Sequence, residues 1–302
     1  MYKISVLINN FNYAAYIAES VRSVLSQDYP DLELIVVDDG SSDGSLEVLA
    51  GFRDDRLKVI AKTNGGQLSA FNAGFAASTG DIICFLDSDD VYLPGYLAAV
   101  AEFFSAHPEC GCLLGEVEYF GSRSGHGRFF PDGRLGCAPF SVATRHLWRG
   151  VPTSAISLRR EVASAILPCT DNEEFWRTRA DDLLVWGAEL VGAVKYCFST
   201  PPVRYRIHDR NFFYGSRNSG GASRQRREAA DRFCSRIIKK NALSLSRLLK
   251  IEMLKGDTAF SGRLRGWLRA GRTGMAPLTE WLKCGFLLFG GTFARSSSAR
   301  EK

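Results

Sequence analysis

Three aspartates follow a short apolar segment in the first third of the chain. Residues 82–86, Ile-Ile-Cys-Phe-Leu, form a continuous apolar run that is typical of a buried strand. Asp87, Ser88, Asp89 and Asp90 come directly after it. An Asp-x-Asp spacing at the end of a strand can hold Mg²⁺ or Mn²⁺, and such a cation can hold a diphosphate. Aspartates are also common in turns and helix caps, so the motif alone leaves both interpretations open.

The elements that must position these carboxylates alternate between strand and helix. Hydrophobic periodicity predicts strands at 3–8, 32–37, 57–61 and 81–86, with helices at 13–27, 45–52 and 68–77. This order is typical of an α/β fold with a mainly parallel sheet and helices on both faces. Right-handed crossovers bring the carboxyl ends of such strands to one edge of the sheet, where open α/β sheets bind ligands. We therefore expect the polar turns at 9–12, 38–43 and 87–90 to converge.

Two common nucleotide-binding motifs are absent from the sequence. The turn after the first predicted strand reads Asn-Asn-Phe-Asn and has no glycine, which excludes the dinucleotide-binding Gly-x-Gly-x-x-Gly pattern at that position. No Gly-x-x-x-x-Gly-Lys-Ser/Thr segment occurs either. Neither of these motifs therefore explains the role of the carboxylates at the edge of the predicted sheet.

The N-terminal region contains four short motifs at the ends of its predicted strands and at the start of a predicted helix. They are Ser-Val-Leu-Ile-Asn-Asn-Phe-Asn (5–12), Val-Val-Asp-Asp-Gly-Ser-Ser-Asp-Gly-Ser (36–45), Asn-Gly-Gly-Gln-Leu-Ser-Ala-Phe-Asn-Ala-Gly (64–74) and Phe-Leu-Asp-Ser-Asp-Asp (85–90). By these motifs the region resembles family 2 glycosyltransferases of the GT-A fold, of the type that makes bacterial cell-surface polysaccharides. The order and spacing of the motifs match the family over residues 3–100. The resemblance implies a Rossmann-like GT-A catalytic domain at 1–222. Its nucleotide-sugar half would be about 1–110 and its acceptor half about 111–222.

The resemblance also implies roles for individual residues of the donor site. Asp39 would hydrogen-bond the uracil or ribose of a nucleotide sugar, and Asn9 and Phe11 would line the base pocket. Gln67, Asp87 and Ser88 would contact the nucleotide sugar, and Asp87 and Asp89 would bind the metal. Relatives often have Arg before the Asn of the third motif, where this chain has Phe71. The diphosphate would then depend more on the metal or on another cation.

Asp181 and Asp182 stand at the start of a predicted buried helix near residues 183–191. One interpretation is a plain helix cap, since carboxylates are favourable at a helix N-terminus. The resemblance favours a catalytic one, with Asp182 as general base and Asp181 in support. A base is needed because the acceptor hydroxyl must lose a proton as it attacks the anomeric carbon. A single displacement of this kind inverts that carbon.

The segment Tyr205-Arg206-Ile207-His208 also resembles the family, in which such a run closes the catalytic domain. By this resemblance Arg206 would contact the diphosphate and His208 would be a third metal ligand. A lone histidine is more often a hydrogen-bonded structural residue, so both interpretations stay open. The following loop, 209–223, is either a lid over the donor or a linker.

The middle and C-terminal regions give weaker patterns. The sequence predicts a helix from 94 to 106, a strand at 112–120, an irregular region at 121–150, a strand entering a helix at 151–160, short strands at 194–198 and 203–207, a long amphipathic helix at 224–250, and short helices broken by Gly256, Gly262, Gly266 and Gly271. The apolar segment 281–293 is too short to span a bilayer. It suits either a membrane interface or burial on the catalytic domain.

The charge of the chain is divided unevenly. The net charge is +5, but residues 223–302 hold 18 basic and 6 acidic side chains, against 20 and 27 in residues 1–222. A basic helical extension on an acidic body indicates an anionic partner such as a membrane surface, or simply a solvated helical face. We expect no nucleic-acid partner, because the body is acidic and no recognition motif appears. Eight cysteines without a Cys-x-x-Cys pair, and an N-terminus without a signal-peptide pattern, favour the cytoplasm, with peripheral binding to the inner face of the cytoplasmic membrane.

The sequence therefore predicts an inverting, metal-dependent transferase that uses Mn²⁺ or Mg²⁺. It would move a sugar from a nucleotide-sugar donor, a UDP-sugar by our interpretation, to a hydroxyl of a glycan or lipid-linked glycan acceptor. The alternative is a non-catalytic nucleotide-sugar-binding or assembly protein on the same fold.

Overall fold

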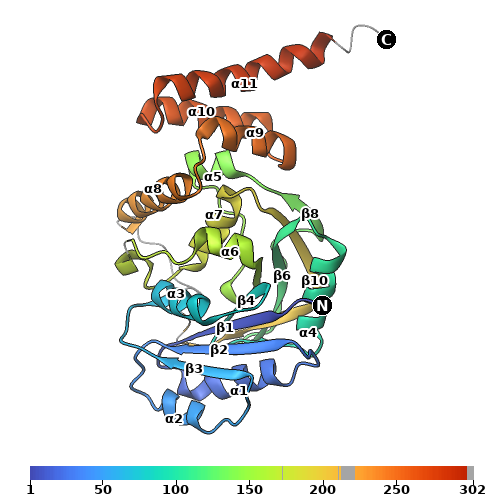
Figure 1. Ribbon diagram of the computed structural model, residues 1–302, viewed down its shortest axis with the longest axis vertical. Coiled ribbons are helices and arrows are strands. Elements are labelled where there is room, and N and C mark those ends of the chain that lie inside the picture. Colours follow the sequence, from blue (N-terminus) through green and yellow to red (C-terminus); the bar gives the residue numbers. More distant parts are fainter. Residues whose placement is uncertain (172, 210, 212–221, 298–302) are drawn as a thin grey trace.

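The structure, a computed structural model, describes residues 1–171, 173–209, 211 and 222–297. Within them, one ten-stranded sheet has the order β3-β2-β1-β4-β9-β6-β10-β5, with β7 beside β6 and β8 beside β10 (Figure 1). The strands are β1 Ile4–Asn10, β2 Leu32–Asp38, β3 Leu57–Ala61, β4 Ile82–Asp87, β5 Val91–Tyr92, β6 Cys110–Gly121, β7 Gly125–Gly127, β8 Gly133–Gly136, β9 Ile156–Arg159 and β10 Val194–Ile207.

Helices cover both faces of this sheet. They are α1 Ala14–Leu25, α2 Ser45–Ala50, α3 Gln67–Ala77, α4 Tyr96–Ala106, α5 Pro139–Arg145, α6 Arg160–Ile166, α7 Asp181–Leu190, α8 Ala222–Lys240, α9 Leu245–Lys255, α10 Phe260–Thr273 and α11 Leu278–Ser297, with short 3-10 turns η1 Thr153–Ala155 and η2 Glu173–Trp176. In Figure 1, α1 and α2 lie on one side of β1–β3, and α3 lies on the other. The predicted α/β fold is confirmed.

The N-terminal half of the sheet is parallel, as its sequence predicts. β1 pairs in parallel with both β2 and β4, and β2 pairs in parallel with β3. The register sets Asn9 opposite Asp87 and Asn10 opposite Asp38. Three of the polar turns therefore meet at one edge of the sheet, because their strands end at the same level.

The middle of the chain is more regular than its composition predicts. The two short strands expected at 194–198 and 203–207 belong to one strand, β10, whose pairing with β6 is irregular between Phe198 and Val203. The region expected to be irregular contains β7, β8 and α5. These elements were missed because glycine and aromatic residues dominate the segment, so no strand or helix period is visible.

Two expectations for the C-terminal region are wrong. The predicted long helix at 224–250 is two helices, α8 and α9, and Ser244 caps α9 by accepting a hydrogen bond from the Arg247 backbone N–H at 3.2 Å. Gly262, Gly266 and Gly271 do not break the chain, because all three lie within α10. A Cβ at Gly266 would lie 2.4 Å from Thr144 Oγ1, so this glycine lets α10 pack closely on α5.

Helices α9–α11 form the end of the molecule opposite β1–β3 (Figure 1). Buried Glu252 of α9 joins them to α5 by accepting hydrogen bonds from the Ser141 backbone N–H at 2.8 Å and from Ser141 Oγ at 2.7 Å. Among the described residues, no helix has both the length and the apolar character needed to cross a bilayer. Most of the predicted lid or linker at 209–223 lies outside the described residues.

Candidate active site

A cavity of about 450 Å³ opens at the carboxyl edge of β1, β2 and β4. Seven residues predicted for the donor or metal site line it: Asn9, Phe11, Asp39, Gln67, Asp87, Ser88 and Asp89. They come from four segments that are far apart in the sequence. The predicted convergence of the polar turns is therefore realised in a single cavity.

Asp87 sits at the end of β4 with amide groups around its carboxylate. Asn9 Nδ2 donates to Asp87 Oδ1 at 3.0 Å, and Gln67 Nε2 donates to the same oxygen at 3.3 Å. Burial, together with the nearby Asp89 charge, raises the pKa of Asp87 to about 7. Phe71, at the position where relatives often carry Arg, packs edge-to-face on Phe85 with ring centroids 5.1 Å apart. Asp87 is therefore hydrogen-bonded by two amides, and Phe71 packs in the core next to its strand.

Asp39 is held rigidly by the loop that precedes α3. Its Oδ1 accepts from Lys62 Nζ at 2.7 Å and from the Gly65 backbone N–H at 2.9 Å, and its Oδ2 accepts from the Gly66 backbone N–H at 2.6 Å. One lone pair of Oδ2 stays available for a ligand N–H or O–H. Gly66 has φ +90°, and a Cβ there would lie 2.3 Å from Arg177 Cα. Only glycine lets this loop approach the chain before α7 so closely.

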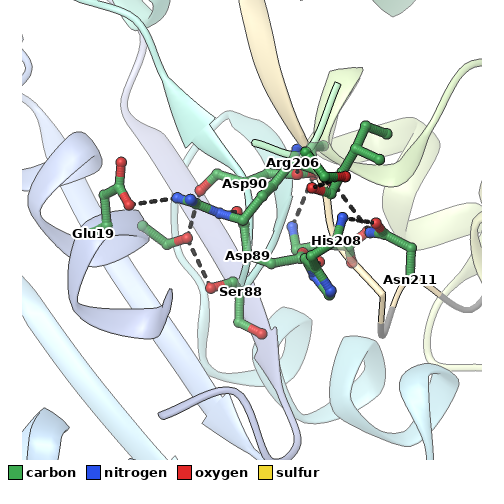
Figure 2. A network of polar contacts seen from close by, with 12 residues as sticks. Glu19, Ser88, Asp89, Asp90, Arg206, His208 and Asn211 are labelled. Atoms are coloured by element: carbon green, nitrogen blue, oxygen red, sulfur yellow. Dashed lines mark hydrogen bonds and ion pairs between the residues drawn. The ribbon is translucent and has the colours of Figure 1, made fainter. Parts of the chain in front are cut away.

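The acidic turn after β4 is tied to the end of β10, as Figure 2 shows. His208 Nε2 lies 2.9 Å from Asp89 Oδ2, and its ring stacks on Tyr16 with centroids 4.8 Å apart. Asp90 accepts from Ser154 Oγ at 2.5 Å and from the Arg206 backbone N–H at 2.8 Å. Burial and the Asp89 and Asp87 charges raise the pKa of Asp90 well above its usual range. The turn therefore crowds carboxyl groups beside the cavity.

Arg206 lies in this network and not in the cavity lining. Its Nε donates to the Asp89 carbonyl oxygen at 2.8 Å, and its guanidinium forms an ion pair with Glu19 (Figure 2). The guanidinium also packs over the rings of Tyr16 and Phe120, at 4.9 and 4.2 Å from their centroids. The geometry assigns Arg206 to holding the acidic turn, which differs from the diphosphate contact expected from the sequence.

The expected metal ligands are only partly assembled. Within the described residues no three His, Cys, Asp or Glu side chains come together as a cation site. Asp89 and His208 nevertheless lie side by side, with Asp87 on the same cavity. Mg²⁺ and Mn²⁺ commonly take one or two protein ligands and complete their shell with water and substrate phosphates. The carboxylate and imidazole donors fit such an ion.

Asp181 and Asp182 begin α7 as predicted, but they differ in surroundings. Asp182 is 2% exposed and forms ion pairs with Arg226 of α8 and, at 3.6 Å, with Arg179. Asp181 is partly exposed, and burial together with the Asp182 and Asp87 charges raises its pKa to about 7. Neither lines the 450 Å³ cavity, but Arg179, which does line it, pairs with Asp182, so the two aspartates lie next to the cavity.

The cavity also contains residues that sequence reasoning missed. Arg177, Thr178 and Arg179 line it from the segment between η2 and α7. This segment is fixed by hydrogen bonds to Gln67, whose backbone N–H donates to the Arg177 carbonyl at 2.9 Å and whose Oε1 accepts from the Ala180 backbone N–H at 2.8 Å. The only sign of these residues in the sequence is an Arg-x-Arg pattern just before the acidic start of α7. This pattern lies about a hundred residues after the N-terminal motifs, so the sequence does not show that the two regions meet.

Comparisons with known proteins identify sequence relatives of this chain. Residues 5–147 match the family described as glycosyl transferase family 2. An uncharacterized glycosyltransferase of Nostoc sp. is 35% identical over 218 residues, which cover 69% of this chain and 66% of that protein. A β-1,3-glucosyltransferase of Campylobacter jejuni, named for the acceptor GalNAc(5)-diNAcBac-PP-undecaprenol, is 34% identical over 38% of this chain and 39% of its own length. The chain thus spans at most about two thirds of these relatives.

Solved structures share the fold. TarS of S. aureus (residues 1–349) in complex with UDP-GlcNAc matches with a TM-score of 0.65 and 21% identity over 82% of this chain and 70% of that one. The mannosyltransferase PcManGT of Pyrobaculum calidifontis, in complex with GDP-Man and Mn²⁺, matches with a TM-score of 0.52 and 16% identity over 94% and 86%. With four family motifs converging on one cavity at the edge of a parallel sheet, the chain belongs to glycosyltransferase family 2.

Proposed function

We propose that this protein is an inverting glycosyltransferase that moves a sugar from a nucleotide-sugar donor to a hydroxyl of a glycan acceptor. The observation that carries the proposal is the single cavity into which Asp39, Asp87 and Asp89 converge beside the acidic start of α7. Asp39 would accept from the base or ribose. Asn9 and Phe11 would flank the base. The fold and family support this class of reaction.

The leaving diphosphate gains negative charge in the transition state, which nearby cations stabilise. Arg177 and Arg179 line the cavity and can supply part of this charge, in place of the arginine that Phe71 replaces. A bound Mg²⁺ or Mn²⁺, held by Asp89 and His208, would neutralise the rest. Arg206 keeps the Asp89 backbone in place through its bond to the carbonyl oxygen.

We assign the general base to Asp182, with Asp181 in support. Arg226 and Arg179 both pair with Oδ2 of Asp182 and orient the carboxylate, so its other oxygen, Oδ1, would take the proton of the acceptor hydroxyl. One observation favours the opposite assignment: the pKa of Asp181 is raised to about 7, where a carboxylate takes a proton readily. Asp182→Asn and Asp181→Asn separate the two. Replacing the residue that acts as the base should lower kcat by about 10²- to 10⁴-fold, and replacing its neighbour should lower kcat by much less.

The pairing of Asp182 with Arg226 favours a second candidate, a non-catalytic nucleotide-sugar-binding protein, because the ion pair occupies one oxygen of the carboxylate assigned as the base. This candidate predicts donor binding without transfer. Arg226→Gln then decides between them: faster or unchanged transfer fits an enzyme, and no transfer by either form fits a binding protein.

For the substrates we propose a UDP-sugar and a lipid-linked glycan. TarS, which shares the fold, binds UDP-GlcNAc, and the C. jejuni relative is named for an undecaprenyl diphosphate-linked acceptor. The excess of basic residues in 223–302 supports an anionic membrane as the place where such an acceptor is met.

Calorimetric titration with UDP, GDP and dTDP, each with Mn²⁺ and with chelator, tests the donor site. We expect UDP to bind selectively and more tightly with Mn²⁺. Selective binding of GDP or dTDP would change the donor and keep the enzyme class. Binding of none of them would contradict the proposed function.

A further inference from the structure

Helix α11 carries an exposed apolar stripe. Leu278, Leu282 and Phe286 are spaced four residues apart, so they lie on one face of the helix. Their exposed fractions are 69%, 54% and 78%. On the neighbouring helix α10, Phe260 and Leu268 are also exposed. Large apolar side chains gathered in this way usually mark a surface that binds something.

The stripe is not needed to hold the helices together, because the opposite face of α11 does that. Cys284 and Leu288 of α11 are buried. Trp281 stacks on Trp267 of α10 with ring centroids 4.4 Å apart. Each indole N–H donates to the other residue's carbonyl oxygen, at 2.9 and 3.0 Å. The α10–α11 pair is therefore a rigid unit that presents the stripe outward.

Basic side chains are exposed on the two helices that carry these apolar residues. They are Arg265 and Arg272 of α10, and Lys283 of α11, which forms an ion pair with Glu280. Glu280 is turned inward: Ser246 Oγ donates to it at 2.8 Å and Lys283 Nζ at 3.0 Å, and these bonds lower the pKa of Glu280 to about 2. Since residues 223–302 hold 18 basic and 6 acidic side chains, two copies of this surface would repel each other. An anionic lipid surface complements it, with the apolar side chains in the headgroup region and the basic ones on the phosphates.

We propose that the Leu278–Leu282–Phe286 stripe of α11 is a docking surface for an anionic membrane, on which the protein lies without spanning it. This extends the proposed function, whose lipid-linked acceptor would lie in the same membrane. It can nevertheless be tested without any transfer assay, so the two can fail separately.

Co-sedimentation of the full-length chain with vesicles tests the proposal. The probes are vesicles of mixed phosphatidylglycerol and phosphatidylcholine, and vesicles of phosphatidylcholine alone. The stripe variant is Leu282→Ser with Phe286→Ser, and the charge variant is Arg265→Gln with Arg272→Gln. We expect the wild type to bind the anionic vesicles and to be released by salt. Both variants should bind at least about tenfold more weakly.

Control variants replace exposed residues on the catalytic body. Leu46→Ser with Val59→Ser controls for the loss of exposed apolar surface, and Lys58→Gln controls for the loss of charge. Circular dichroism confirms that each variant is folded. Equal vesicle binding by the wild type and the stripe variant overturns the proposal. So does a stripe variant that changes only the oligomeric state in sedimentation velocity, because the stripe is then a contact between copies.

Discussion

At the scale of single residues, several buried carboxyl groups lie in the cavity and beside it. Burial and mutual repulsion raise the pKa of Asp87 and of Asp181 to about 7, and that of Asp90 well above its usual range. Groups shifted in this way are concentrated at functional sites. The physical consequence is an electrostatic repulsion among these carboxylates, which a cation or a proton relieves.

This repulsion predicts a pH dependence of stability. The pKa of Asp181 is about 7 in the folded state and about 3.9 in an unfolded chain, so the folded state binds the proton more tightly. The resulting stabilisation is fully present below about pH 4 and is lost as the pH rises through about 7. We expect Asp181→Asn to flatten the fall of the melting temperature between about pH 5 and 8. Exposed Asp55→Asn is the control, and identical pH profiles for both variants would refute the assignment.

A second prediction concerns the proposed metal ligands. Asp89→Asn and His208→Ala should each weaken Mn²⁺ binding about tenfold to a hundredfold, measured calorimetrically in the presence of UDP. The reason is that each removes one of two adjacent donors. UDP binding measured with chelator should stay close to that of the wild type. Unchanged Mn²⁺ affinity in both variants would show that the ion is held elsewhere.

At the scale of elements, contacts between chain segments distant in sequence define the site and the C-terminal packing. The register of β1 with β2 and β4 aligns the polar turns, and the Gly66 turn lets the Asp39 loop meet the segment before α7. In the same way, Gly266 lets α10 approach α5. These glycines serve close approach, which a side chain would block.

Gly266→Ala is therefore expected to destabilise the protein by about 1–3 kcal/mol, although alanine is the better helix former. The new Cβ would lie 2.4 Å from Thr144 Oγ1. Chemical denaturation measures the free energy of unfolding. Thr144→Ala removes the nearest atom, so adding it to Gly266→Ala should cost less than the two single changes together. Ser261→Ala, on the exposed side of α10, is the control. A Gly266→Ala protein as stable as the wild type would contradict this packing.

At the scale of the whole molecule, the C-terminal helices are packed into the catalytic body. The sequence predicts a basic extension that begins at residue 223, yet α8 carries Arg226 to Asp182, and α9 carries Glu252 to the first turn of α5. Leu248 and Leu249 of α9 are fully buried. A boundary near 222 thus separates regions of different charge, but the two regions share one core.

A chain that ends after Lys240 tests this view. It loses α9–α11 and exposes the surface of α5 that they cover. We expect its free energy of unfolding to fall by about 3 kcal/mol or more, since each fully buried leucine contributes about 1.5–3 kcal/mol. Thermal and chemical denaturation would measure the loss. An unchanged melting temperature, or two separate transitions in the full chain, would show that the extension is an independent domain.

The sequence by itself determined the parallel half of the sheet and the meeting of its polar turns at one cavity. Short apolar runs, helical periodicity and polar turns are local signals, and in a parallel α/β unit they also dictate where the turns meet. For this reason the order of strands and helices is enough to predict that Asn9, Asp39, Asp87 and Asp89 lie together.

Only the tertiary structure decided the contacts between distant segments, because the hydrophobic periodicity of one segment carries no information about its partner. It moved Arg206 from the expected diphosphate contact to Glu19 and the Asp89 carbonyl. It also brought Arg177 to the cavity and Arg226 to Asp182. Arginine is long and flexible, so its partner depends on which elements pack within its reach. That packing is a property of the whole fold, and periodicity in one segment cannot reveal it.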